Sequence, residues 1–150
     1  MAKSYNNIGN VYNSQGKYEE ALEYYQKDLD ITVRVFGGDH PLVADSFNNI
    51  GAVYEGKGDF GNALVHHQKA LEIRTRVFGS DHPDVANSKE NIGLVFQKMT
   101  KKSEARQMFT EAAGIRWKVL GADHPLTKKS LPSALRELQT VCCKERPGGI

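Results

Sequence analysis

Hydrophobic residues in the middle of the chain recur at the spacing of one face of an α-helix. The first five such positions are Val43, Phe47, Ile50, Gly51 and Tyr54. Pro41 suits the first turn of this helix, where its missing N–H leaves no hydrogen bond unmade, and Asp39 or His40 can cap that turn. The pattern therefore predicts a helix that begins at Pro41 and ends near Lys57.

A second apolar run follows Gly58 and Asp59, which favour a turn. The residues expected to face inward on this second helix are Phe60, Ala63, Leu64, His67, Ala70, Leu71, Val77 and Phe78. Gly79 then ends the helix. The two helices form a hairpin, and neither can bury its apolar face alone, so each hairpin needs a neighbour.

The hairpin is one unit of a tandem repeat. The motif Asp-His-Pro occurs three times at a constant spacing of 42 residues. Repeats 5–46 and 47–88 are identical at 23 of 42 positions, and repeat 89–130 matches the second repeat at 14 of 42. A fixed period in this range indicates stacked supersecondary units that share one continuous core.

The other two repeats keep most of the inward positions. They are Ile8, Gly9, Tyr12, Tyr18, Ala21, Leu22, Tyr25, Leu29 and Phe36 in the first repeat, and Ile92, Gly93, Phe96, Ala105, Phe109, Ala112, Ile115 and Leu120 in the third. The third repeat has Met-Thr-Lys-Lys, starting at Met99, in place of a glycine-containing turn, so we expect a looser turn there. Asp28 replaces the alanine that Ala70 and Ala112 provide, which puts the packing of the first repeat in question.

Half a repeat follows the third motif. Residues 131–144 carry four apolar residues at helical spacing and should form a terminal cap helix, which Pro132 should kink or restart. The tail, residues 145–150, should fray. We therefore expect a single all-α domain over residues 1–150, a right-handed solenoid of three hairpins and a closing helix.

The composition is that of an ordinary soluble domain, with 39% hydrophobic and 25% charged residues and a net charge of +2. Basic residues concentrate from Lys98 onward without interleaved aromatic residues, so we expect neither a nucleic-acid partner nor a membrane partner. The two cysteines, Cys142 and Cys143, are adjacent, which argues against a disulfide framework and fits a reducing compartment. With no signal-peptide pattern or membrane span in the sequence, we expect a cytoplasmic protein.

The residues that could carry chemistry have structural explanations. Equivalent Asp-His pairs lie at least one helix-packing distance apart, about 8 to 10 Å, which is too far to share a metal ion, so helix capping explains them. His67 occupies the position of Tyr25 and Phe109 and is interpreted as a packing residue, with His66 beside it on a wetter face. A catalytic site breaks a repeat because its groups converge once, and no such constellation is present in the sequence. We expect no enzyme activity, no cofactor and no metal.

Small residues accompany the apolar pattern at fixed positions of each repeat. The motifs are Ile8-Gly9-x-x-Tyr12 with Ala21, Ile50-Gly51-x-x-Tyr54 with Ala63 and Ala70, and Ile92-Gly93-x-x-Phe96 with Ala105 and Ala112. They resemble the tetratricopeptide repeat, and the 42-residue form is similar to the repeats of kinesin light chain and of nephrocystin-like proteins. The resemblance covers about residues 5–138. It implies an adaptor or scaffold whose first helices line a concave groove for an extended peptide or a partner helix.

Chaperone-binding members of that family resemble one another in a cationic clamp for a C-terminal carboxylate. The matching positions in this chain are Asn6, Asn10, Asn49, Asn87 and Asn91. Asn10 and Asn49 keep the two asparagines of the clamp, but none of the three cationic positions is Lys or Arg. A carboxylate clamp is therefore not expected.

A ladder of amides is expected in the groove instead. The candidate peptide-binding residues are Asn6, Asn7, Asn10, Asn48, Asn49 and Asn91. Counting from the inward Ile50, Asn49 lies about 100° away and borders the core, whereas Asn48 lies about 200° away and is expected to point well clear of it. An amide can pair with the N–H and C=O of a peptide together, whatever its side chains are. The alternative is that these asparagines solvate the surface or bond along their own helices.

Two other functions stay open. The chain could be a structural spacer or oligomerisation segment of a longer repeat array, or a regulatory arm of a larger enzyme. The first repeat also begins without an Asp-His-Pro motif, which leaves Val11 and Tyr18 partly uncovered. We therefore expect self-association through the N-terminal repeat.

Overall fold

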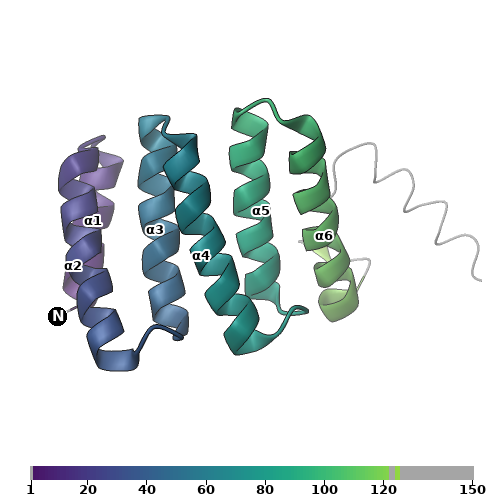
Figure 1. Ribbon diagram of the computed structural model, residues 1–150, viewed down its shortest axis with the longest axis horizontal. Helices are drawn as coiled ribbons and strands as arrows, with labels where there is room; N and C mark the ends of the chain where they lie inside the picture. The colour runs from purple at the N-terminus through teal and green to yellow at the C-terminus, as the bar shows by residue number, and fades with distance from the viewer. Residues whose placement is uncertain (1, 122–123, 126–150) are drawn as a thin grey trace, which may run out of the picture.

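The computed structural model describes residues 2–121 and 124–125 (Figure 1). Its helices are α1 (Ala2–Ser14), α2 (Tyr18–Phe36), α3 (Pro41–Lys57), α4 (Phe60–Phe78), α5 (Pro83–Lys98) and α6 (Lys102–Leu120). They form the hairpins α1–α2, α3–α4 and α5–α6, which confirms the expected all-α solenoid. The predicted cap helix 131–144 with its kink at Pro132, the tail 145–150 and both cysteines lie outside the described residues.

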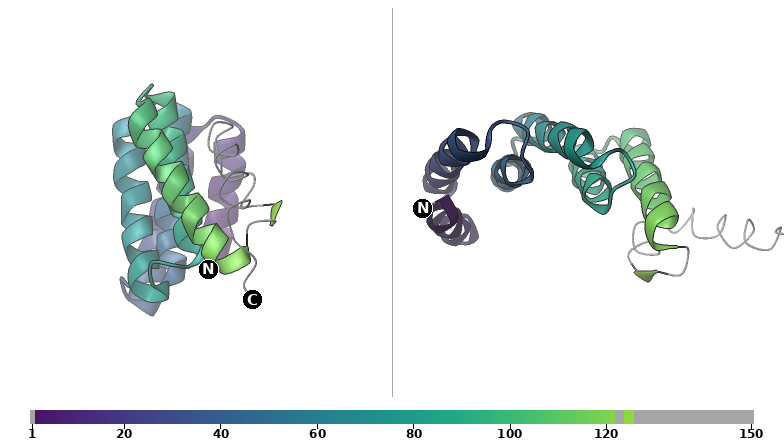
Figure 2. Two further views of the ribbon diagram at one scale, coloured as in Figure 1. Left: turned by 90° about the vertical axis from the view of Figure 1, so that its right-hand side faces the viewer. Right: turned by 90° about the horizontal axis from the view of Figure 1, so that it is seen from below.

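The second helices α2 and α4 each pack between two first helices. α2 lies against α1 of its own hairpin and against α3 of the next, and α4 lies in the same way between α3 and α5. The hairpins therefore stack into an arch, with the first helices on its inner side, as the view from below in Figure 2 shows. Among the helices of the described part, none combines the length and the apolar character that crossing a membrane requires.

In the first two Asp-His-Pro motifs, the histidine caps a first helix. His40 Nδ1 accepts a hydrogen bond from the backbone N–H of Leu42 at 3.2 Å, and Pro41 occupies the first turn that follows. His82 Nδ1 accepts from the backbone N–H of Asp84 at 3.1 Å in the same way. Of the two capping residues that the sequence allows before α3, the structure therefore uses His40.

The same motif ties neighbouring hairpins together. The His40 ring stacks on Phe36 with 4.3 Å between centroids, and the His82 ring stacks on Phe78 at 4.2 Å. The aspartate before each of these histidines pairs with a residue of the following second helix. Asp39 pairs with Arg76 at the end of α4, and Asp81 accepts from Lys118 at 3.4 Å near the end of α6. These ion pairs lie at the surface, so each contributes little to stability.

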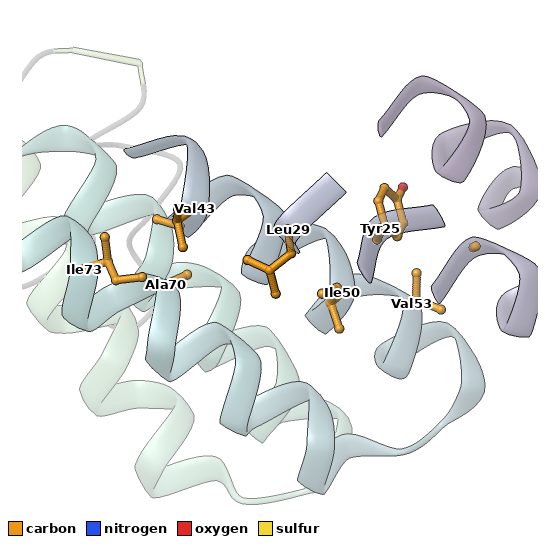
Figure 3. Packing of buried hydrophobic residues seen from close by; sticks show 9 residues of the cluster. Tyr25, Leu29, Val43, Ile50, Val53, Ala70 and Ile73 are labelled. Atoms are coloured by element: carbon orange, nitrogen blue, oxygen red, sulfur yellow. The ribbon is translucent and has the colours of Figure 1, made fainter. Parts of the chain in front are cut away.

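The core runs continuously through the first two hairpins (Figure 3). Its buried residues include Tyr25, Leu29, Val43, Ile50, Val53, Ala70 and Ile73, which come from α2, α3 and α4. Each fully buried valine, leucine or isoleucine among them contributes about 1.5 to 3 kcal/mol to folding. Because one core draws on helices of two hairpins, a single hairpin cannot complete it alone.

Several residues predicted to face inward are exposed instead. Phe36, Val77 and Phe78 lie at the ends of second helices, and Phe78 is 37% exposed. α4 has 19 residues against 17 in α3, so its last turn has less of the first helix beside it. Ile8 on α1 is also exposed, because no described helix packs on that side of α1.

The turn of the third hairpin is not looser than the others, contrary to expectation. The N–H of Lys101 donates to the carbonyl of Phe96 at 2.9 Å, and the equivalent bond closes the other two turns at the same distance. Thr100 adopts a positive φ of 61° in the place of Gly16 and Gly58, whose φ values are 72° and 79°. The turn keeps its geometry, but a β-branched residue holds the left-handed conformation that glycine adopts freely.

Candidate binding groove

The inner side of the arch presents the exposed faces of the first helices. On α3 this exposed strip contains Asp45 and Ala52, with the half-buried Asn48 on one flank and Asn49 on the other. The 42-residue period places Lys3 and Asn10 of α1, and Asn87 and Leu94 of α5, at the positions of Asp45 and Ala52. The surface is therefore polar and of mixed charge, with amide groups along both flanks of the central helix.

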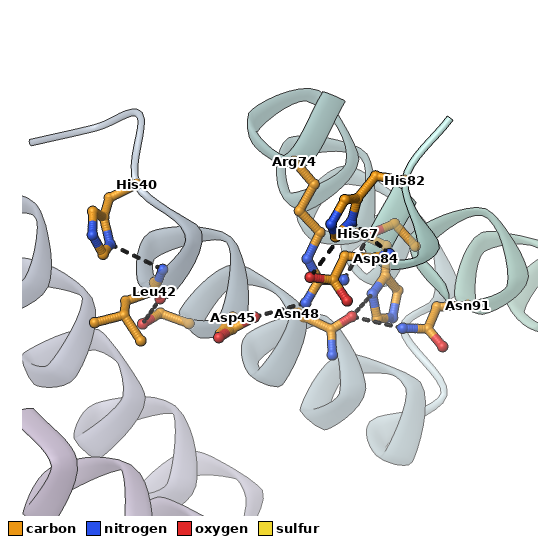
Figure 4. A network of polar contacts seen from close by, with 11 residues as sticks. His40, Leu42, Asp45, Asn48, His67, Arg74, His82, Asp84 and Asn91 are labelled. Carbon is orange, nitrogen blue, oxygen red and sulfur yellow. Dashed lines mark hydrogen bonds and ion pairs between the residues drawn. The ribbon is translucent and has the colours of Figure 1, made fainter. Parts of the chain in front are cut away.

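Asn48 and Asn91 connect the second and third hairpins (Figure 4). The side-chain amide of Asn91 donates to Asn48 Oδ1 at 2.7 Å, and the same oxygen lies 3.1 Å from Nδ1 of His67. His67 is only 2% exposed, so this network extends from the groove into the core. The structure thus brings together two of the predicted binding residues, on adjacent first helices.

The other ring nitrogen of His67 faces a carboxylate. His67 Nε2 lies 2.9 Å from Glu55 Oε1, and Lys98 Nζ lies 2.8 Å from Glu55 Oε2. Burial raises the pKa of Glu55, but the hydrogen bonds from His67 and Lys98 outweigh it and hold the pKa below the ordinary value of 4.5. Glu55 is therefore ionised at neutral pH and joins α3, α4 and α5 in one polar network.

The expectation that Asn48 points well clear of the core is wrong. The buried arc of α3 is wide, from Ser46 and Val53 on one side to Ala44 and Gly51 on the other. Asn48 therefore borders this arc, where α4 and α5 meet α3, and bonds to residues of both helices. The prediction counted the angle from Ile50 alone and so assumed a narrow buried face. The helices packed against α3 bury a wider face.

On α1, two asparagines pair with each other and with a buried tyrosine. Asn10 Nδ2 donates to Asn6 Oδ1 at 3.2 Å, one helical turn away. The Tyr25 hydroxyl donates to Asn10 Oδ1 at 2.6 Å. Burial, and then the negative charge of Asp28, raises the pKa of Tyr25, so its hydroxyl stays a donor at neutral pH. Asn6 and Asn10 thus bond within the chain, as the alternative reading of the amides proposes, and Asn10 remains exposed.

Asn7 and Asn49 have no hydrogen-bond partner among the described residues. Asn7 is exposed on α1, and Asn49 is half-buried at the edge of the α3 strip. Their amides therefore keep their full capacity for a ligand. Of the six predicted residues, these two are the ones that folding leaves unused.

Two arginines that the sequence reasoning missed bond to residues of the exposed strip. Arg74 on α4 donates to Asp45 Oδ1 at 2.7 Å and to Ser88 Oγ at 2.8 Å, and so bridges α3 and α5. Arg116 on α6 donates to Asn87 Oδ1 at 2.7 Å and to Glu90 Oε2 at 2.6 Å. Both arginines occupy the same repeat position, and this shared register was the available sequence signal.

His66 has a local structural role. His66 Nδ1 donates to the carbonyl of Asn62 at 2.8 Å, and its ring stacks on Tyr54 with 5.2 Å between centroids. Over the described part of the chain, no three His, Cys, Asp or Glu side chains gather as a metal site would need. His40 and His82 cap helices, His67 packs in the core, and His66 bonds along its own helix.

Comparisons with known proteins agree with this architecture. A tetratricopeptide repeat family model matches residues 1–65 and 46–118. Curated protein sequences gave no match. Repeats assigned to a kinesin light chain of Podosopora anserina align with a TM-score of 0.72 and 21% identity, over 85% of this chain and 61% of that one.

Two further solved structures share the fold. BtubC (BKLC) from P. vanneervenii aligns with a TM-score of 0.72 and 18% identity, over 100% of this chain and 67% of that one. The N-terminal domain of stress-induced protein-1 from C. elegans aligns with a TM-score of 0.63 and 22% identity, over 92% and 94% of the two chains. This chain therefore spans about three fifths of the kinesin light chain structure and nearly all of the stress-induced protein domain.

Proposed function

The chain belongs to the tetratricopeptide repeat family, and we propose that it is a protein-interaction module that binds an extended segment of a partner protein on the inner side of the arch. One observation carries the proposal: Asn7 and Asn49 present amides without partners among the described residues, at equivalent positions on adjacent first helices. An extended peptide offers N–H and C=O groups along its length, which such amides can pair with.

The hydrogen bonds among Asn48, Asn91 and His67 preorganise the same surface. Asn48 and Asn91 are fixed by each other and by the buried His67, so the middle of the groove is held in one conformation before a ligand arrives. A preorganised surface loses less side-chain entropy on binding. The module needs no catalytic group for this role, and we propose that it acts as an adaptor or scaffold in the cytoplasm.

Site-specific photo-crosslinking tests the proposal. A photoreactive amino acid replaces Ala52, on the exposed strip of α3, and in a matched control replaces Glu72, which is exposed on α4. In cytosolic extract, the Ala52 position should crosslink to a discrete partner segment and the Glu72 position should not. Equal crosslinking at both positions, or crosslinking at Glu72 alone, would place the interaction on the outer surface and contradict the proposal.

A second function, an oligomerisation segment, is favoured by Val11. This residue is 53% exposed, whereas Val53 and Val95, at the same repeat position, are completely buried. An apolar position that the other repeats cover is suited to a contact with a second copy or a further repeat.

A further inference from the structure

The three second helices differ at one repeat position that faces the groove. Thr32 of α2 is equivalent to Arg74 of α4 and Arg116 of α6. The two arginine side chains are only 12% and 4% exposed, and both donate to groups on a first helix. In the second and third hairpins, an arginine of the chain itself thus fills the space between second helix and groove.

The first hairpin has a hollow at this place. Thr32 is much shorter than arginine, and its hydroxyl is engaged with the carbonyl of Asp28 at 2.8 Å. The space, about 420 Å³, lies between α1, α2 and α3, with Thr32 and Asp28 in its lining and the exposed Phe36 and Leu42 beside them. Its lining also includes Lys3 and Asp45, which belong to the exposed strip of the first helices, so the hollow opens into the groove.

The hollow has a buried carboxylate in its lining. Asp28 stands where Ala70 and Ala112 stand in the other repeats, and it is only 4% exposed. Asp28 Oδ2 accepts from the Ser46 hydroxyl at 2.6 Å, and no donor among the described residues reaches the other oxygen, Oδ1. A carboxylate buried with one hydroxyl donor is incompletely compensated, and a cation that brings N–H groups would offset this cost.

We propose that this hollow receives an arginine side chain of the bound partner. The guanidinium would take the place that Arg74 and Arg116 occupy in the other hairpins, and donate to Asp28 Oδ1 and to Asp45. Its planar fork of five N–H donors can serve two carboxylates at once, which an ammonium does with less geometric precision. The aliphatic part of the side chain would lie along Phe36 and Leu42.

The hollow is lined by two carboxylates, Asp28 and Asp45, and by one cation, Lys3. Asp45 is shared, because it already accepts from Arg74. Lys3 is exposed at the rim and has no ion pair among the described residues, so it stays hydrated and opposes a second cation only through screened repulsion. Removing Lys3 should therefore strengthen binding of a cation. At a site for an anionic group, the same change would weaken binding.

The inference rests on the proposed function in one respect: the hollow opens into the groove that we assign to the partner. It is tested on the full chain by ¹⁵N–¹H NMR titration with the blocked tripeptide acetyl-Gly-Arg-Gly-amide. The matched probe replaces arginine with citrulline, which keeps the shape and removes the charge. We expect saturable shifts around Asp28, Thr32 and Ser46 with arginine and none there with citrulline.

Four variants complete the test. Asp28→Ala introduces the alanine of the other two repeats and should weaken binding about tenfold or more, because one charge-assisted interaction is lost. Should that variant fold poorly, Asp28→Asn keeps the size of the side chain and is expected to weaken binding in the same direction. Thr32→Arg fills the hollow from within and should abolish binding while raising the thermal stability of the chain. Lys3→Ala should tighten binding.

The outcomes separate this inference from the proposed function. Equal shifts with arginine and citrulline, or an affinity unchanged by both Asp28 variants, would overturn the arginine pocket even if the Ala52 crosslink identifies a groove partner. Arginine binding that depends on Asp28 supports the pocket even if no partner crosslinks to the groove. Tighter binding of the tripeptide to Asp28→Ala would show that the Asp28 carboxylate does not hold the guanidinium, and would also overturn the inference.

Discussion

Gly51 lies directly against the imidazole ring of His67. A β-carbon at Gly51 would stand 2.9 Å from Cε1 of that ring, closer than real side chains approach. We predict that Gly51→Val lowers the free energy of unfolding by about 1 to 3 kcal/mol, because an overpacked core must move the buried ring or the helix. Urea unfolding followed by circular dichroism measures this. Gly9 and Gly93 face Tyr25 and Phe109 in the same way, so close approach is a property of the repeat.

Gly114 provides the control for that prediction. It lies in α6, where an added β-carbon meets nothing within 4 Å. Gly114→Ala should stabilise the chain by up to about 1 kcal/mol, because alanine has the higher helix propensity. If Gly51→Val and Gly114→Ala had similar effects, close approach at Gly51 would not be the cause.

Thr100→Gly should stabilise the chain by about 0.5 to 1.5 kcal/mol. Thr100 holds a φ of 61° that disfavours a β-branched residue, and glycine removes that strain at the cost of extra freedom in the unfolded chain. The reverse change, Gly58→Thr, should destabilise the equivalent turn of the second hairpin. Thermal and urea unfolding of both variants measure the pair, and a destabilised Thr100→Gly would show that the turn is not strained.

Stability should fall in acid partly through Glu55. Its pKa is held below 4.5 in the folded state, so its contribution is complete above that value and is lost as pH falls through the folded pKa. Glu55→Gln should cost about 1 kcal/mol or more at neutral pH and progressively less below pH 4.5. Urea unfolding of both proteins across this range gives the difference directly. Glu72→Gln, at an exposed position without an ion pair in the described part, is the matched control for the loss of a carboxylate.

Asn91→Ala and Asn49→Ala should separate stability from binding. Asn91 donates to Asn48 across two hairpins, so its removal should cost about 0.5 to 1.5 kcal/mol of stability as well as affinity. Asn49 has no partner among the described residues, so its removal should leave the melting temperature nearly unchanged and weaken binding by about 1 kcal/mol. Titration of the partner segment recovered at Ala52 measures the affinities. An affinity that neither variant changes would remove the amides from the proposed site.

Self-association should depend on Val11. Sedimentation velocity over a range of micromolar concentrations is expected to show reversible association, because Val11 and Ile8 leave an apolar patch exposed on α1. Val11→Glu should give a monomer, whereas Val65→Glu, at an exposed position on α4, should associate as the original chain does. A monomer at all concentrations would contradict this prediction.

Much of the fold followed from the sequence because it depends on local spacing. The 42-residue period, the run from Val43 to Tyr54 and the Asp-His-Pro motif predicted hairpins whose helix boundaries the structure confirms to within a few residues. Capping and turn formation involve residues that are close in the chain. They can therefore be predicted from the sequence without knowing which helices pack together. The turn at Thr100 shows the limit, because the packed hairpin keeps its geometry although the glycine is absent.

The sequence by itself determined the repeat, the hairpin and the small residues at the helix contact, because each of these repeats a pattern within one unit. Only the tertiary structure decided where Asn48 points, which asparagines stay free and that Thr32 leaves a hollow. These features depend on which neighbours two hairpins bring together, and periodicity on one helix does not contain that information. Asp28 illustrates the difference: the sequence marked it as a departure, and packing placed its carboxylate in the lining of an unfilled site.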